Sequence, residues 1–185
     1  MKRAYFDYMA TTPVDPLVIQ SMVACLGEQD NFANPASQHL LGQEALKAVD
    51  DAREKVAKAI NANAEEVIWT SGATESDNLA IKGAASFYKR KGQHLITMQS
   101  EHKAVLDCFS MLERQGYRVT YLKPLTNGLI DLKALEKALC EETILVSVMH
   151  VNNEIGVIQP LSDIAKRLEG KGIIFHVDAA QSMGK

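Results

Sequence analysis

Five short apolar runs that alternate with helix-like stretches constrain this chain more than any other feature of its sequence. Their length and their content of β-branched and aromatic residues are typical of buried strands. Strands that alternate with helices favour a mainly parallel sheet covered by helices on both faces, which is a three-layer α/β fold. The runs occupy residues 66–71, 94–100, 118–123, 143–150 and 172–179.

The helix-like stretches are recognised by apolar residues at spacings of three and four. The clearest covers residues 37–60, and its apolar residues form one stripe, which a helix buries against a partner. Gly92, Gly116 and Gly170 follow three of the stretches, where a left-handed residue commonly ends a helix. The stripe comprises Leu41, Ala45, Val49, Ala52, Val56, Ala59 and Ile60. Further helices are expected at about 16–27, 74–90, 102–115, 131–140 and 161–169.

The composition is that of an ordinary globular protein and excludes several classes of function. The 185 residues are 46% hydrophobic and 23% charged, with a net charge of -3. No basic stripe indicates nucleic acid or a membrane surface, and no apolar run approaches the roughly 18 residues of a membrane helix. The N-terminus lacks the apolar stretch of a signal peptide. We therefore expect a cytoplasmic protein that binds neither nucleic acid nor membrane.

The cysteines argue against a disulfide framework and against a metal site. Cys25, Cys108 and Cys140 are odd in number, lie far apart and form no C-x-x-C motif. Each lies in or at the end of an expected helix. We interpret all three as packing or incidental thiols.

Ligands of open α/β sheets bind beyond the carboxyl ends of the strands, so the residues at and after the end of each run are the candidates for a site. "TSGATESDN" (70–78) opens a helix whose free N–H groups and dipole favour an anion, which makes it a candidate phosphate cradle. The alternative is an ordinary helix cap formed by Thr74 and Asp77. His102 follows the second run and could stack on a flat ligand or move a proton, although surface or packing histidines are common there.

The fourth and fifth runs also end in polar residues. His150, Asn152, Asn153 and Glu154 follow the fourth run, and Asn153 could bind a ligand or belong to a turn. Asp178 stands at the tip of the very apolar fifth run. It could cap a following helix together with Gln181, or it could be the counter-ion of a cationic ring nitrogen, as in pyridoxal phosphate enzymes. Together the strand ends predict a site for a phosphorylated, cationic, aromatic cofactor.

Seven stretches, in family order and covering nearly the whole chain, resemble the N-terminal part of cysteine desulfurases of the NifS/IscS type. This group belongs to the class V aminotransferases, which are fold-type I pyridoxal phosphate enzymes. The combination of "TSGATESDN", "HVNNEIG" and "HVDAAQS" is highly specific for the resemblance. The matching stretches are residues 6–16, 34–42, 70–85, 100–107, 127–139, 144–160 and 173–185.

The resemblance implies a role for each of the residues that match the family's motifs. Ala73 and Thr74 would hold the cofactor phosphate, and His102 would stack on the pyridine ring and take part in proton transfer. Asn153 would lie beside the ring and help to position the substrate carboxylate.

Two further residues would contact the ring itself. Asp178 would pair with the ring nitrogen, and Gln181 would donate a hydrogen bond to the phenolic oxygen of the ring. The implied reaction removes sulfur from L-cysteine, giving alanine and a protein persulfide. The sulfur would pass to scaffold and acceptor proteins for iron–sulfur clusters and tRNA thiolation, and family members are homodimers.

The resemblance also implies that part of the machinery lies outside residues 1–185. These residues would form the N-terminal segment and most of the large domain, without its C-terminal part and without the small domain. The Schiff-base lysine and the nucleophilic cysteine would lie further on, and Lys185 would match a different lysine of the family. We therefore expect a fragment that is inactive alone. The alternatives are a selenocysteine lyase or another class V aminotransferase, and a non-catalytic binding fragment.

Overall fold

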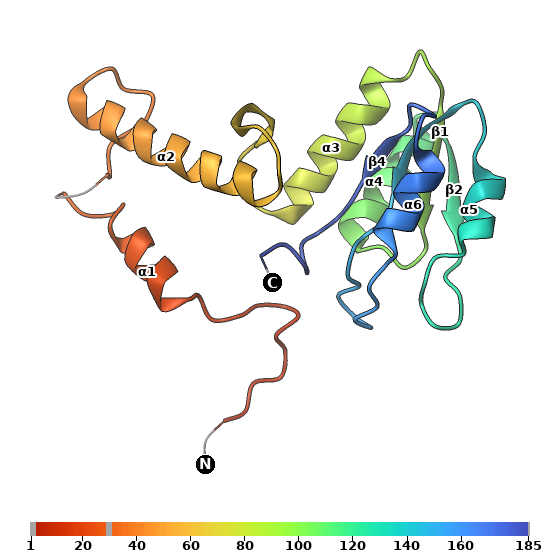
Figure 1. Cartoon of the computed structure of the whole chain (residues 1–185), viewed down its shortest axis with the longest axis horizontal. Helices are drawn as coiled ribbons and strands as arrows, with labels where there is room; N and C mark the ends of the chain where they lie inside the picture. The colour runs from red at the N-terminus through yellow and green to blue at the C-terminus, as the bar shows by residue number, and fades with distance from the viewer. Residues whose placement is uncertain (1–2, 29–30, 185) are drawn as a thin grey trace. The chain divides into compact units, whose positions relative to one another are not determined.

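The computed structural model describes residues 3–28 and 31–184, so Lys185, which the resemblance matches to a lysine other than the cofactor lysine, lies outside the described residues. The chain divides after Trp69 into two compact units, and each is described by itself. The first unit holds α1 (Pro16–Val23), α2 (Leu40–Ala59) and a short 3-10 helix (Ala64–Glu66). The second holds the remaining helices and all of the strands among the described residues (Figure 1).

The helices of the first unit begin where their sequence provides a cap. Asp15 accepts a hydrogen bond from the Leu17 amide, and Pro16 occupies the first position of α1, where its missing N–H costs nothing. The His39 side chain accepts from the Gly42 amide at the start of α2. The expected helices are therefore confirmed, although α1 ends at Val23 rather than at residue 27 and α2 begins at Leu40 rather than at residue 37.

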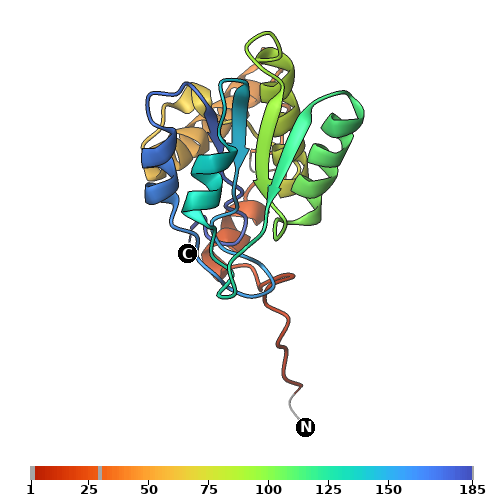
Figure 2. The same ribbon diagram turned by 90° about the vertical axis from the view of Figure 1, so that its right-hand side faces the viewer.

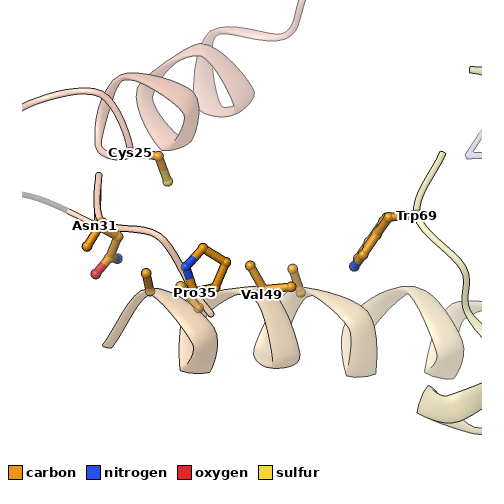
Figure 3. Close-up of a pocket in the computed structure, with 9 residues that line it drawn as sticks. Cys25, Asn31, Pro35, Val49 and Trp69 are labelled. Atoms are coloured by element: carbon orange, nitrogen blue, oxygen red, sulfur yellow. The ribbon is translucent and has the colours of Figure 1, made fainter. Parts of the chain in front are cut away.

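The apolar stripe expected on α2 is mostly not buried within the first unit. Of its members only Ala45 is buried, and Leu41 is 48% exposed. Part of the stripe instead lines an open apolar groove together with Cys25, Pro35 and Trp69 (Figure 3). The period of the sequence predicted the helix correctly but not its burial, because burial depends on what packs against the stripe.

The second unit is built on a four-stranded sheet in which every neighbouring pair of strands is parallel. The strands fan out side by side with helices packed against them (Figure 2), and their order is β2-β1-β3-β4. They run over β1 (His94–Met98), β2 (Arg118–Leu122), β3 (Thr143–Ser147) and β4 (Ile174–His176).

Helices cover both faces of this sheet, which confirms the expected three-layer α/β fold. On one face, α3 (Ala73–Phe87) and α4 (Lys103–Arg114) bury Ile81, Val105 and Phe109 against Leu95 and Leu145. On the other face, α5 (Leu132–Ala138) and α6 (Leu161–Leu168) cover the sheet. Their Leu135, Ile164 and Leu168 pack with Ile96, Met98, Val146 and Val148. Neighbouring strand residues thus serve opposite faces, as the alternation of a strand requires.

The expected strand at residues 66–71 is wrong. Residues 67–70 join no strand of the described sheet, and the side chains of Ile68 and Trp69 are 68% and 48% exposed. Arg53 of α2 holds this segment instead: its guanidinium donates to the Val67 carbonyl and lies over the Trp69 ring. An apolar, β-branched run becomes a strand only where another strand offers hydrogen bonds, and none does so here.

The glycines expected to end helices behave in two ways. Gly116 and Gly170 adopt positive φ, at 95° and 71°, which confirms the expectation for them. Gly92 does not, so the expectation is wrong there. A Cβ at Gly92 would collide with the Glu142 backbone, so this glycine serves the close approach of two loops. No helix among residues 3–28 and 31–184 has both the length and the apolar character needed to cross a membrane.

Candidate cofactor site

The carboxyl ends of β1, β3 and β4 lie at one edge of the sheet because these strands are parallel. Helix α3 runs in the opposite direction, so its first turns lie near the same edge. Asp77 Oδ1, in the second turn of α3, is 3.6 Å from Nε2 of His176, the last residue of β4. The carbonyl of Ala85, near the other end of α3, accepts a hydrogen bond from the hydroxyl of Tyr117, which precedes β2. Side chains from α3 and β4, which are far apart in sequence, therefore meet at this edge.

The start of α3 keeps its anion-binding groups available. Its N-cap residue, Gly72, has no side chain to occupy the first amides, and Ala73 and Thr74 are exposed. Glu75 accepts hydrogen bonds from the Ser71 amide and hydroxyl at 2.7 and 2.5 Å, and these bonds lower the pKa of Glu75. The alternative cap by Thr74 and Asp77 is therefore wrong, since Gly72 is the cap and Asp77 is buried in the second turn.

Asp178 is buried and lies just beyond Val177, the residue that follows β4. Its Oδ1 accepts a hydrogen bond from the Ala180 amide at 2.9 Å, and its main-chain carbonyl accepts from the His150 amide at 2.9 Å. The chain beyond it, as far as it is described to Gly184, forms a turn and not a helix. The alternative role of Asp178 as the cap of a following helix therefore finds no support in this part of the chain.

Asp77 shows that the pieces of the edge lie close together. Burial is the main cause that raises the pKa of its carboxyl to about 6, and the negative charge of Asp178 raises it further. The charge of His102 acts in the opposite direction. The pKa of one carboxyl on α3 therefore depends on the charges of both Asp178, beyond β4, and His102, at the start of α4. Its Oδ2 is buried and has no hydrogen-bond partner among the described residues.

His102 is the N-cap of α4. Its Nδ1 accepts a hydrogen bond from the Ala104 amide at 3.2 Å, so the neutral ring carries its proton on Nε2. The ring is exposed, and it remains accessible to a ligand. Capping and ligand binding are therefore compatible for this residue, because they use different nitrogens.

The loop after β3 is fixed to its neighbours mainly by Asn152. This buried side chain donates to the Ser100 carbonyl at 2.8 Å and accepts from the amides of Glu154 and Ile155. Asn153, for which a ligand role was expected, is half-buried beside it. Gln181 is also half-buried, and the neighbouring Ser182 hydroxyl lies 2.9 Å from His150 Nδ1. The expected site residues after β3 and β4 therefore belong to one connected loop cluster.

The sequence pattern missed two buried carboxyls at this edge. Asp77 is part of the series Asp77, Ile81 and Ala85, spaced by four residues on the buried side of α3, so a polar residue in an apolar stripe was the available signal. Glu101 directly precedes His102 and is 6% exposed. Burial raises the pKa of Glu101 to about 8, the hydrogen bond from the Met149 amide opposes this, and the charges of Asp178 and Asp77 add to it.

The three cysteines differ from one another in burial. Cys108 is buried, which confirms its packing role, and burial is the main cause that raises its thiol pKa. Cys25 and Cys140 are exposed, so of the two expected readings, packing or incidental thiol, packing does not apply to them. Partial burial raises the pKa of Cys140, but hydrogen bonds from Thr143 and Arg118 outweigh it and the pKa lies below its ordinary value. The Arg118 Nη2 to Cys140 Sγ distance is 3.1 Å.

Cys140 is expected to react with iodoacetamide at pH 7.5 faster than Cys25, and Cys108 is expected to react slowest. Arg118→Gln removes the donor to the sulfur and should slow the modification of Cys140 by roughly two- to fivefold, because less thiolate is present. Peptide mass spectrometry over time measures all three rates, and Arg114→Gln is the control. Equal rates at Cys140 in the Arg118 variant and the unchanged chain would contradict the assignment.

The comparisons with known proteins agree with this architecture. Residues 4–185 match the family described as Aminotransferase class-V. The cysteine desulfurase IscS of Enterobacter sp. (strain 638) is 58% identical over 182 residues, which cover 98% of this chain and 45% of that protein. A solved structure titled "NIFS-LIKE PROTEIN" superposes with a TM-score of 0.93 at 40% identity, covering 98% of this chain and 50% of the other.

A second solved structure carries a ligand in its title. "SspA in complex with cysteine" superposes with a TM-score of 0.90 at 44% identity, covering 96% of this chain and 51% of the other. This chain therefore spans about half the length of the relatives that it matches.

Proposed function

This chain belongs to the aminotransferase class-V family, and we propose that it forms the N-terminal part of a pyridoxal phosphate-dependent cysteine desulfurase. The enzyme would remove sulfur from L-cysteine, leave alanine and pass the sulfur on as a protein persulfide. The names of the similar proteins support this choice, since one is a cysteine desulfurase and another was solved with cysteine.

One observation of the structure carries the proposal. The buried carboxyl of Asp77 lies 3.6 Å from His176 at the end of β4, and the charges of Asp178 and His102 shift its pKa in opposite directions. A strand-end carboxylate and an accessible imidazole therefore act on the same region. The start of α3, with its available amides, lies at the same edge of the sheet. A carboxylate in such a place is stabilised by a cation, and a phosphate is stabilised by a helix N-terminus. These groups fit a phosphorylated pyridinium.

Pyridoxal phosphate, when bound, would supply an electron sink for the bonds of the substrate's α-carbon. The chain's own residues would do the rest. Ala73 and Thr74 would bind the phosphate through main-chain amides and the Thr74 hydroxyl. Asp178 would hold the proton on the ring nitrogen, because its negative charge raises the cost of losing that proton.

The remaining site residues would orient the ring and the substrate. His102 would stack on the ring, and it would present the proton on Nε2 because Nδ1 is bound to the Ala104 amide. Gln181 would donate a hydrogen bond to the phenolic oxygen of the ring. Asn153 would lie beside the ring and help to position the substrate carboxylate.

The proposal extends to the setting of the whole protein. It would be a cytoplasmic homodimer that delivers sulfur to iron–sulfur scaffold proteins and to acceptors for tRNA thiolation. The Schiff-base lysine and the nucleophilic cysteine would be supplied by the half of the relatives' length that this chain does not span. The 185-residue chain alone would then hold part of the cofactor site without the sulfur-accepting group.

The chain alone is expected to release no alanine from L-cysteine above the background of free pyridoxal phosphate. A chimera that continues it with the second half of the Enterobacter relative should release alanine, and Asp178→Asn in this chimera should lower the rate by about 100-fold or more. Alanine is measured by amino-acid analysis. A folded, cofactor-loaded chimera without turnover, or robust turnover by the chain alone, would overturn the proposal.

A further inference from the structure

We propose that Glu101 is a positioning residue that remains a neutral carboxylic acid and holds the extension of β3 against which Asp178 is placed. The inference deepens the proposed function, because it concerns how the counter-ion of that same site is held. Glu101 would touch neither the substrate nor the cofactor. It acts through the main chain of Met149 and His150.

The geometry begins with the direction of the amides beyond β3. The Val148 amide donates to the His176 carbonyl at 3.1 Å, and the His150 amide donates to the Asp178 carbonyl at 2.9 Å. Both therefore face β4. In an extended chain, successive amides point to opposite sides, so the Met149 amide faces β1.

Strand β1 cannot offer a main-chain acceptor there, because it ends at Met98 and the chain turns at residues 99–101. Glu101 replaces the missing carbonyl: its Oε1 accepts from the Met149 amide at 3.0 Å. The extension of β3 is thereby held on one side by a side chain and on the other by the main chain of Asp178. A buried amide without an acceptor at this point would cost stability.

The charge state follows from the surroundings of Glu101. Its Oε2 is buried and has no hydrogen-bond partner among the described residues. The titratable groups that face it are Asp77 on α3 and Asp178 after β4, and both disfavour its ionisation. His102 follows it in the chain, and His176 lies against Asp77. Glu101 as a neutral acid keeps its hydrogen bond and leaves Asp178 as the carboxylate that meets a cation.

The pH dependence of unfolding tests the charge state. A carboxyl whose pKa is about 8 when folded and 4.5 when unfolded contributes stability at low pH, and this contribution is lost as the pH rises toward 8. Asp77, with its pKa of about 6, completes most of its change below pH 6.5. In the window from pH 6.5 to 8.5 Glu101 is therefore the main carboxyl that still changes, and comparison with Glu101→Gln removes the contributions that both proteins share, such as those of His94 and His176.

Glu101→Gln imitates the neutral acid and keeps the acceptor. Between pH 6.5 and 8.5 the unfolding temperature of the unchanged chain should fall by roughly 5 °C more than that of Glu101→Gln. At about pH 4.5 and below, where Glu101 is protonated in both the folded and the unfolded chain, the two should agree within about 2 °C. Glu141→Gln, an exposed substitution on the same unit, should follow the unchanged chain. Parallel profiles for the unchanged chain and Glu101→Gln would overturn the neutral state.

Hydrogen exchange tests the positioning. In Glu101→Leu the Met149 and His150 amides should exchange at least about tenfold faster than in the unchanged chain, whereas Glu101→Gln should retain their protection. Unchanged exchange in Glu101→Leu, or lost protection in a stable Glu101→Gln, would overturn it. Neither measurement needs the cofactor, so failure here is distinct from failure of the proposed function, which a loss of cofactor binding on Asp178→Asn tests.

Discussion

Asp178→Asn is expected to lower the affinity of this chain for pyridoxal phosphate by about 100-fold or more. Asn keeps an oxygen that can accept the hydrogen bond from the Ala180 amide, so the turn after β4 should survive. Only the negative charge is lost. Removing one partner of a buried ion pair costs about 3 kcal/mol or more, which corresponds to the stated change in affinity.

The change in affinity is measured by titrating pyridoxal phosphate into each protein and following the absorbance of the bound cofactor. Asp163→Asn on α6 is the matched control, since its carboxylate is exposed and lies in the layer over the opposite face of the sheet from α3 and α4. The control should bind as the unchanged chain does. Equal affinities for the Asp178 and Asp163 variants would show that Asp178 has no part in cofactor binding.

Phe109→Ala is expected to lower the free energy of unfolding of the second unit by about 3–5 kcal/mol. Phe109 is fully buried on α4, among residues of α3, β1 and β3. Its removal leaves a cavity between the sheet and the layer of α3 and α4. The first turns of these two helices lie at the carboxyl edge of the sheet. The unfolding temperature should fall by roughly 6–20 °C.

Urea denaturation followed by circular dichroism provides the measurement for Phe109→Ala. Phe87→Ala is the matched control, because this side chain is 80% exposed at the end of α3 and contacts the Tyr88 ring at a centroid distance of 5.0 Å. It should change the free energy of unfolding by less than about 1 kcal/mol. A similar cost for both phenylalanines would mean that the buried layer is not organised around Phe109.

Four of the five strands could be predicted from the sequence because their signal is local. Short apolar runs such as 94–98 and 143–147 are buried on both faces. A strand that is buried on both faces needs almost entirely apolar residues, so its composition alone identifies it. Residues 66–71 have the same composition but no neighbouring strand, and composition does not encode pairing. The left-handed conformation predicted for Gly92 was wrong for a related reason. The backbone that Gly92 approaches, at Glu142, is 50 residues further along the chain, so no local pattern indicates it.

The location of the site could be predicted, but its electrostatics could not. Asp178 and His102 were recognisable because they stand at the ends of apolar runs, and parallel strands bring such ends together. The burial of Asp77 and Glu101 depends on how α3 and the loop after β1 pack on the sheet. Their raised pKa values arise from that packing and from one another, so no local pattern contains them.

The protonation state of the bound ring tests the central claim most directly. Pyridoxal phosphate labelled with ¹⁵N in the ring, bound to this chain at pH 8, reports by NMR whether the ring nitrogen carries a proton. We predict the chemical shift of a pyridinium in the unchanged chain and that of a neutral pyridine in Asp178→Asn. A neutral ring nitrogen in the unchanged chain would contradict the account.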